Sequence, residues 1–170
     1  NVIGGGDWAK DRLIPDVMIS LSKSEKTKIR KPYAIRPWQH VLEPLSGYLL
    51  LGEKLLKGEK EFADAWNFGP TSEDILTVEE VLLNMKRFWD KIDYEVDTSL
   101  ERFHESNILK LDCSKAYSLL KWKNVWDSKE AIQKTTRWYK AYYENSEIIS
   151  PLDLEEYVAD AKVKNALWVN

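Results

Sequence analysis

The chain has 170 residues, enough for one domain with a substantial hydrophobic core and too few to favour two. Its formal net charge is −3 and its isoelectric point is near 5.6, so no broad basic surface indicates a nucleic-acid partner. The single cysteine, Cys113, excludes an internal disulfide and a zinc site built from cysteines. No apolar run approaches the roughly 20 residues that span a bilayer. No signal-peptide pattern is visible either, so we expect a cytoplasmic protein without a membrane partner.

The first residues are typical of the end of a strand. The sequence starts at Asn1, without a methionine, and continues at once into Val2 and Ile3. A strand needs a hydrogen-bonded neighbour, and a natural chain seldom begins inside such an element. We therefore expect this chain to be the C-terminal piece of a longer protein.

Three glycines at positions 4–6 follow this strand. With Ala9 they match the spacing of a dinucleotide-binding fingerprint. That fingerprint requires a helix that opens at the glycines and an acidic residue about twenty positions later. Here the strand is truncated, Asp7 and Trp8 are charged and bulky, and the next strand is basic. We interpret the glycines as a flexible turn that crosses between domains and lets the backbone approach a ligand.

The next elements alternate between helix and strand. An amphipathic helix is predicted from four apolar residues at helical spacing: Ile14, Val17, Met18 and Leu21. Pro15 is tolerated because it lies in the first turn. Residues 28–31 are predicted as a short strand and residues 34–41 as extended chain, since Arg36 precedes a proline.

Two apolar stripes run along the helix predicted over residues 42–56. They are Leu42, Leu45, Leu49 and Leu56 on one side, and Tyr48, Leu51 and Leu55 on the other. A helix that is apolar on two sides must be buried on two sides. We expect the rest of a longer protein, or a second copy of this chain, to cover it. Residues 63–68 are predicted as a buried strand before a Gly-Pro turn, with Trp38 and Trp66 in the core.

The second half of the sequence is more plainly helical. Thr77 and Glu80 have the spacing of a capping box. The helix that follows them presents one apolar face, made of Val78, Val81, Leu82, Met85, Phe88 and Trp89. Residues 94–98 are predicted as a strand.

Three further helices are predicted towards the C-terminus. Asp112 is a suitable N-cap for a short helix, and Asp127 opens a longer one. Ser150 and Pro151 form a clear helix start. Residues 144–149 are the expected linker before it.

One stretch concentrates groups that suit a phosphorylated or nucleotide ligand. Arg36, Trp38 and His40 lie within a few residues of each other, just before the apolar helix. A guanidinium matches phosphate oxygens and stacks on rings. His40 itself is interpreted as a hydrogen-bonded structural histidine rather than an acid or base.

Several segments together resemble a known family. They are Asn1–Trp8, Asp11–Asp16, Ile35–Pro44, Trp66–Pro70, Leu109–Ala116, Leu120–Trp122 and Thr136–Tyr139. The chain resembles the extended short-chain dehydrogenase/reductases and, within them, the subfamily of CDP-glucose 4,6-dehydratases. The resemblance covers about residues 1–145, whereas the segment from Ser146 onward matches nothing that we can place.

The resemblance implies an α/β fold of the Rossmann type, of which this chain is the C-terminal substrate-binding part. Residues 1–145 would be the substrate-binding portion, with residues 42–69 returning to the Rossmann lobe, and residues 146–170 a helical extension. Members use NAD to oxidise the sugar at C4, eliminate water across C5–C6 and return the hydride to C6. Their NAD loop and catalytic residues lie before Asn1, so we expect neither NAD binding nor turnover from this chain alone. Deoxysugar synthesis for polysaccharide, in a homo-oligomer, is also implied.

By the same resemblance, one group of residues faces the diphosphate of a nucleotide sugar. Asn1 lies at the end of the entering strand. Arg12 contacts the diphosphate at a helix start and Leu13 forms an apolar wall. Arg36 is the main clamp. A solvated surface position is the alternative for Arg12.

The remaining residues implied by the resemblance lie nearer the nucleotide. Under the base and ribose lie Lys28, Ile29 and Arg30. Asn67 is a polar contact on the returning strand, and a satisfied core amide is its alternative. His104 and Glu105 form a loop at the nucleotide end, although several relatives carry an arginine in that region.

Two other functions are compatible with these residues. One is an epimerase or dehydratase that acts on another nucleotide sugar. The other is a non-catalytic module that binds a sugar nucleotide or supports assembly, because no nucleophile–base constellation is present in the sequence.

Overall fold

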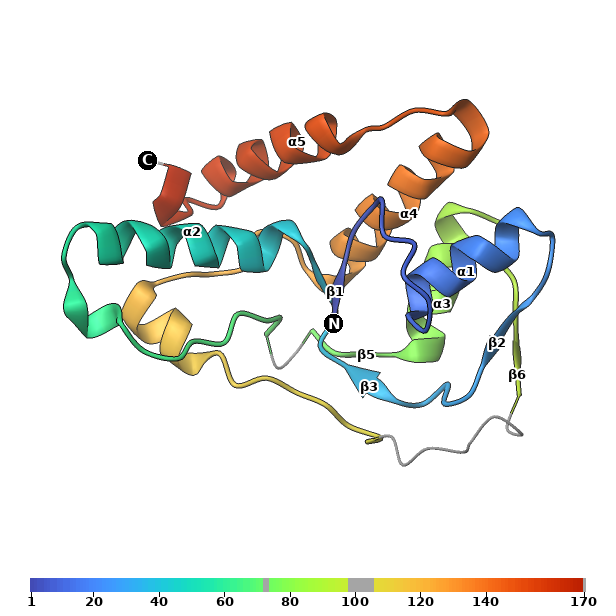
Figure 1. Cartoon of the computed structure of the whole chain (residues 1–170), viewed down its shortest axis with the longest axis horizontal. Coiled ribbons are helices and arrows are strands. Elements are labelled where there is room, and N and C mark those ends of the chain that lie inside the picture. The colour runs from blue at the N-terminus through green and yellow to red at the C-terminus, as the bar shows by residue number, and fades with distance from the viewer. Residues whose placement is uncertain (72–73, 98–105, 170) are drawn as a thin grey trace.

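The computed structural model of the chain describes residues 1–71, 74–97 and 106–169. Helices surround short paired strands, as expected for an α/β protein (Figure 1). The parallel pairs are β1 (Val2–Ile3) with β4 (Gln39–His40), and β2 (Thr27–Ile29) with β6 (Tyr94–Val96). The antiparallel pair is β3 (Ile35–Arg36) with β5 (Leu76–Thr77). In the described part of the chain, no helix is both long and apolar enough to cross a membrane.

The main core lies between helices α1 (Leu13–Ser22), α3 (Val78–Phe88) and α4 (Ser128–Asn145). The apolar face predicted for α1 is buried, including Pro15 in its first turn. The fully buried members of this core include Met18, Val81, Leu82, Met85, Trp89, Ile92, Ile132 and Tyr139. Trp38 is buried there as predicted, whereas Phe88 is 39% exposed, so its predicted place on the packed face is wrong.

Capping residues set the starts of α3 and α4. The Thr77 hydroxyl accepts from the N–H of Glu80 at 3.2 Å, and the Glu80 carboxylate accepts from the N–H of Thr77 at 2.8 Å. Asp127 and Glu130 make the same reciprocal pair at α4. Each pair satisfies N–H groups that the helix leaves without partners. The capping box predicted at Thr77 and the start predicted at Asp127 are confirmed.

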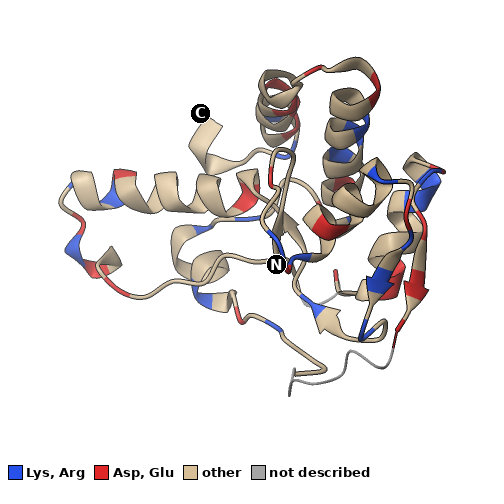
Figure 2. Ribbon diagram, turned by 45° about the vertical axis from the view of Figure 1, so that its right-hand side comes forward, with Lys and Arg blue, Asp and Glu red and all other residues tan. Residues whose placement is uncertain are grey.

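Opposite charges alternate over the surface. Figure 2 shows basic β2 beside acidic β6. Across this pair, Lys28 Nζ lies 3.9 Å from Glu95 Oε1 and 3.6 Å from Asp97 Oδ2. These exposed pairs contribute at most about 1 kcal/mol each. They fix the direction in which Lys28 points.

Helix α2 (Leu42–Leu56) is held by its polar side. The Glu43 carboxylate, fully buried, accepts from the N–H groups of Trp126 at 2.7 Å and Val125 at 3.0 Å. The Ser46 hydroxyl donates to the Glu43 carbonyl at 2.7 Å. It also accepts from Trp122 Nε1 at 3.0 Å and from the Tyr157 hydroxyl at 3.1 Å.

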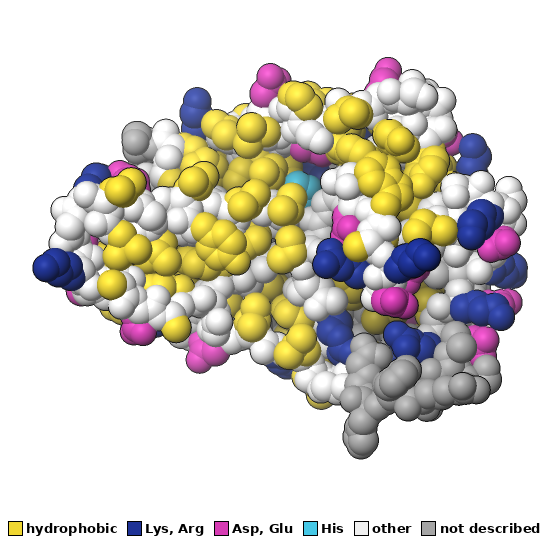
Figure 3. Space-filling model, viewed as in Figure 1, with side chains coloured by type: hydrophobic (Ala, Val, Ile, Leu, Met, Phe, Trp, Pro, Cys, Tyr) yellow, Lys and Arg dark blue, Asp and Glu magenta, His cyan; other side chains and the backbone are white. Residues whose placement is uncertain are grey.

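The apolar stripes of α2 are not buried on both sides within this chain. Leu49 is 75% exposed and Leu56 91% exposed, and Leu45, Tyr48 and Leu55 are exposed as well. Figure 3 shows hydrophobic side chains gathered over this part of the molecule. One copy of this chain therefore does not cover these side chains, and their burial by the rest of a longer protein or by a second copy stays a prediction. The side that packs is made of Glu43, Pro44, Ser46, Gly47 and Leu50.

Residues 63–68 do not form the predicted strand. A short 3-10 helix, Lys60–Phe62, is followed by irregular chain in which Ala65 and Asn67 are exposed. Trp66 is half-buried rather than in the core: it stacks on Phe62, with ring centroids 5.8 Å apart, and the Lys115 ammonium lies over it. No described strand lies alongside this segment to pair with it, so its apolar pattern alone does not make it extended.

The C-terminal helix α5 (Ser150–Val163) packs against both α4 and α2. Pro151 lies in its first turn, as predicted. Arg137 on α4 pairs with Asp153 at 2.5 Å and with Glu156 at 2.6 Å. Tyr157 reaches α2 through its hydrogen bond to Ser46. Residues 146–149 link α4 to α5 within the predicted linker.

Before α4, a short π-helix, Ala116–Leu120, follows Asp112, whose carboxylate accepts from the Ser114 N–H.

Candidate functional site

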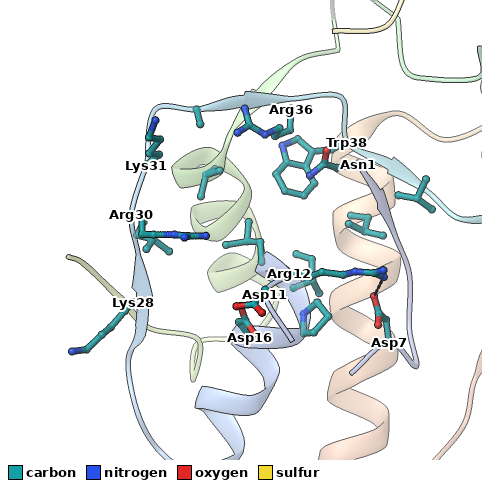
Figure 4. A pocket seen from close by; sticks show the side chains of 18 of the residues that line it. Asn1, Asp7, Asp11, Arg12, Asp16, Lys28, Arg30, Lys31, Arg36 and Trp38 are labelled. Atoms are coloured by element: carbon teal, nitrogen blue, oxygen red, sulfur yellow. Dashed lines mark hydrogen bonds and ion pairs between the residues drawn. The ribbon is translucent and has the colours of Figure 1, made fainter. Parts of the chain in front are cut away.

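A cavity of about 1010 Å³ opens between β1, α1, β2 and β3. This volume is of the size that small-molecule sites usually have. The sequence-predicted residues that line it are Asn1, Arg12, Leu13, Lys28, Ile29, Arg30 and Arg36. Figure 4 shows how the charged ones lie around it. Residues far apart in the sequence are thus brought to one cavity.

Arg36 and Asn1 lie together at one end of the cavity (Figure 4). Arg36 is only 8% exposed, and its Nη1 donates to the Ile35 carbonyl at 2.8 Å. The Asn1 amino group donates to the Pro37 carbonyl. The Arg36 guanidinium gives this end of the cavity a positive charge, which favours an anionic ligand.

Two structural supports hold this end in place. Arg36 pairs with Leu76 in the antiparallel β3–β5 ladder. The Trp38 indole donates from Nε1 to the Leu76 carbonyl at 3.1 Å. The backbone around Arg36 is thus fixed on both sides, which reduces the entropy that a ligand contact would cost.

The basic residues of β2 and the turn after it differ in direction. Figure 4 shows Arg30 reaching across the cavity and Lys28 pointing away from it. The ion pairs of Lys28 with Glu95 and Asp97 explain its direction. Ile29 is buried in the core beneath the cavity. Arg30 is therefore the member of this group that is best placed to meet a ligand.

The Arg12 side chain points away from the cavity and towards Asp7 (Figure 4). It occupies the N-cap position of α1 in an extended conformation, and its Nη1 lies 2.9 Å from Asp7 Oδ2. Its side chain is 65% exposed, so this pair is worth little and competes weakly with a ligand. Leu13, half-buried, begins the helix beside it. Both residues line the cavity, but Arg12 does not point into it.

The sequence analysis gave no ligand role to three acidic residues that line this cavity, Asp7, Asp11 and Asp16. Asp16 is half-buried in the first turn of α1. Burial raises the pKa of its carboxyl, and the charge of Asp11 adds to the rise. The Asp11 N–H and the charge of Arg30 oppose it. An acidic residue in a first helical turn normally complements the helix dipole, so the position of Asp16 in the sequence does not indicate a second role.

Asn67, His104 and Glu105 do not add to this cavity. The Asn67 side chain donates to the Asp112 carbonyl at 3.1 Å, on exposed chain away from the cavity. The strand on which it was predicted to lie does not form, so in this structure Asn67 is separate from the other predicted residues and its ligand contact stays a prediction. His104 and Glu105 lie outside the described residues.

His40 is a structural residue, as interpreted from the sequence. It is buried, its Nδ1 accepts from the Leu42 N–H at 3.4 Å, and its ring meets that of Trp126 edge to face at 4.9 Å. Burial, and then the charge of Lys134, lower its pKa to about 4. It is therefore neutral at physiological pH and does not line the cavity.

The glycines at positions 4–6 do not open a helix. Irregular chain continues from them until α1, and Gly6 has φ of +82°. A side chain at Gly5 would overlap the Trp138 ring. Gly5 therefore allows a close approach of the backbone to Trp138, and Gly4 lines the cavity, so the approach of this turn to a ligand stays a prediction. In the described residues no helix starts at these glycines, so this chain does not fit the pyrophosphate of NAD here.

The chain's N-terminal loop is fastened to α4 next to these glycines. The Asp7 N–H donates to the Tyr139 hydroxyl at 3.1 Å. The same hydroxyl donates to the Asp7 carbonyl at 2.6 Å. These bonds join residues 132 positions apart in the sequence and position the wall of the cavity that carries Arg12.

The chain is similar in sequence to a nucleotide-sugar enzyme. It is 43% identical over 162 residues to CDP-glucose 4,6-dehydratase of Salmonella typhimurium strain LT2. The match takes in 94% of this chain and 45% of that enzyme, so the chain spans about half the length of its relative. No family model matches the chain.

Solved structures with the same fold are nucleotide-sugar enzymes. UDP-glucuronic acid 4-epimerase from Bacillus cereus, in complex with UDP-glucuronic acid and NAD, superposes with a TM-score of 0.68 and 14% identity. It covers 84% of this chain and 44% of the epimerase. dTDP-glucose 4,6-dehydratase from Bacillus anthracis, in complex with NAD, gives 0.66 and 17%, over 85% and 43% of the two chains. The chain is related to CDP-glucose 4,6-dehydratase and has the fold of part of an extended short-chain dehydrogenase/reductase.

Proposed function

We propose that this chain forms the sugar-nucleotide-binding part of a NAD-dependent CDP-glucose 4,6-dehydratase, which makes CDP-4-keto-6-deoxyglucose. The observation that carries the proposal is the convergence of Asn1, Arg30 and Arg36 on one cavity. The chain that holds this cavity is 43% identical to such an enzyme. The diphosphate of the substrate carries about two negative charges, which suits a cavity with guanidinium groups on its walls.

Arg36 is the principal diphosphate ligand in this proposal. It is buried, and its backbone is fixed in a strand, so its fork needs little ordering when a ligand binds. Arg30 supplies a second guanidinium from across the cavity. Arg12 contributes only after its exposed pair with Asp7 opens. NAD, which supplies the hydride chemistry, is held outside this chain.

Binding of CDP-glucose to the chain, measured by isothermal titration calorimetry, tests the proposal. We expect Arg36→Ala to weaken binding tenfold to hundredfold, because loss of a charged hydrogen bond costs about 1.5–3 kcal/mol. Arg36→Lys should recover part of the affinity, since a point charge cannot reproduce the fork. NAD added to the chain alone should produce no binding heat and no 4-keto product.

Arg87→Ala is the matched control, because Arg87 is an exposed arginine on α3 that does not line the cavity. It should bind CDP-glucose as the parent does. Thermal unfolding of each variant separates a lost contact from a lost fold. If Arg36→Ala and Arg36→Lys are folded and bind CDP-glucose as tightly as the parent, the assignment of the cavity is wrong.

A further inference from the structure

The cavity proposed to bind the substrate contains a carboxylate that an anionic ligand alone does not explain. Asp16 lines the cavity together with the basic residues Arg30 and Arg36. A negative charge there repels a diphosphate and so weakens binding of any nucleotide. The Asp16 carboxylate favours binding only when the ligand presents a hydrogen-bond donor to it.

Asp16 lies away from the end that holds positive charge. Figure 4 shows Arg36 and Asn1 at one end of the cavity and Asp16, next to Asp11, at the other, with Arg30 projecting between them. A diphosphate at Arg36 therefore leaves the opposite end for the other part of an elongated ligand. For a nucleotide sugar with its sugar directed elsewhere, that part is the ribose and the base.

The position of Asp16 is fixed by α1. It follows Pro15 in the first turn, and the neighbouring Ile14 and Val17 are buried in the core. Among the described residues, no lysine or arginine forms an ion pair with Asp16. The N–H of Asp11 and the charge of Arg30 favour its ionised form, since both act to lower its pKa. A carboxylate has about four acceptor positions. Acceptor capacity thus remains for a ligand on a rigid support.

We propose that Asp16 accepts a hydrogen bond from the exocyclic amino group of cytosine and so selects CDP-sugars over UDP- and dTDP-sugars. This inference rests on the proposed function of the cavity. Cytosine carries an N4 amino donor where uracil and thymine carry the O4 acceptor. A carboxylate oxygen attracts the amino group and repels a carbonyl oxygen. The discrimination therefore has an attractive and a repulsive component, and a polar contact of this kind rejects the wrong ligand strongly.

The test compares binding of CDP-glucose and UDP-glucose to the chain by titration calorimetry at pH 7.5. The parent is expected to bind CDP-glucose at least tenfold more tightly. Asp16→Ala should weaken the binding of CDP-glucose about tenfold, because the hydrogen bond is lost. It should leave the binding of UDP-glucose equal or make it tighter, because the repulsion is removed. Asp16→Asn should bring the two affinities within about threefold, since an amide presents either a donor or an acceptor to the base.

Asp90→Asn is the matched control, because it removes the same charge from an exposed carboxylate that does not line the cavity. It should leave the CDP-glucose to UDP-glucose ratio of the parent unchanged. A ratio that stays at the parental value in both Asp16 variants, with CDP-glucose still bound, overturns the role of Asp16. Equal shifts in the Asp90 and Asp16 variants overturn it too, since they indicate a general effect of the net charge. ADP-glucose binding as tightly as CDP-glucose would contradict selection of cytosine. Failure of the parent to bind either nucleotide sugar contradicts the proposed function itself.

Discussion

Two regions of this molecule differ in how they are packed and in the face that they leave exposed. The cavity lobe, made of β1, β2, β3, α1, α3 and α4, buries apolar residues and leaves polar ones around the cavity. The α2 arm, made of α2 and residues 57–71, buries Glu43 and Ser46 and leaves a row of leucines exposed. The lobe therefore has the organisation of a self-sufficient core. The arm is attached by these polar groups and by the packing of Leu50 and Phe68 against Trp122, and it has an apolar face without a cover in this chain.

The largest loss of stability is expected from a substitution where the α2 arm is attached to the rest of the chain. Glu43→Ala should lower the free energy of unfolding by about 3 kcal/mol or more, because the N–H groups of Val125 and Trp126 each lose a buried acceptor, at about 1–3 kcal/mol each. Urea unfolding at pH 5 measures it. Glu53→Ala, on the exposed side of α2 and paired only with Lys57, should change stability by less than about 0.5 kcal/mol.

The same carboxyl should make the attachment sensitive to pH. Burial outweighs the two N–H bonds and raises the pKa of Glu43 from 4.5 to about 7. Between these values the folded state keeps a proton that the unfolded state has lost, so stability falls as the pH rises. Relative to Glu43→Gln, the parent should lose about 3 kcal/mol between pH 4.5 and 7, at about 1.4 kcal/mol per pKa unit. Parallel pH profiles of the two proteins would contradict this.

A change of intermediate size in the free energy of unfolding is expected from alanine substitutions at two glycines on opposite sides of α2. A side chain at Gly47 overlaps the Phe68 ring, whereas one at Gly52 meets nothing within 4 Å. Gly47→Ala should therefore destabilise by about 1–3 kcal/mol, in spite of the better helix propensity of alanine. Gly52→Ala should stabilise by about 0.5–1 kcal/mol. Thermal unfolding of the two variants tests this prediction. Equal shifts of the unfolding temperature would mean that the two sides of α2 are packed alike.

The smallest effect is expected on the leucine face. Leu49 is 75% exposed, so Leu49→Ser should change the free energy of unfolding by less than about 0.5 kcal/mol. Sedimentation velocity should show less self-association than in the parent if a second copy covers this face. A loss of more than 1 kcal/mol in a monomeric sample would show that Leu49 is packed within the chain.

The features that were predicted correctly depend on neighbouring residues in the sequence. The capping box at Thr77, the buried face of α1 and the start of α5 are each encoded within one or two helical turns. The cavity residues from Asn1 to Arg36 came from the family resemblance, and the structure brings them to one cavity.

The features that were missed depend on distant partners. Periodicity located the apolar stripes of α2 but not which side packs, because that is decided by N–H groups 82 and 83 residues away from Glu43. The strand expected at residues 63–68 lacked a neighbouring strand. Asp16 was missed because its sequence context is that of an ordinary first-turn acid, and only the fold places it opposite Arg36.

The bonds between Asp7 and Tyr139 have a consequence for synthesis on the ribosome. They join positions 132 residues apart, so the loop that carries Arg12 has no anchor until α4 has left the exit tunnel. β1 likewise pairs with β4, which is made much later. Contacts so distant in sequence form slowly because a long loop must close first. The cavity is therefore not complete on the nascent chain until α4 has been made and has left the ribosome.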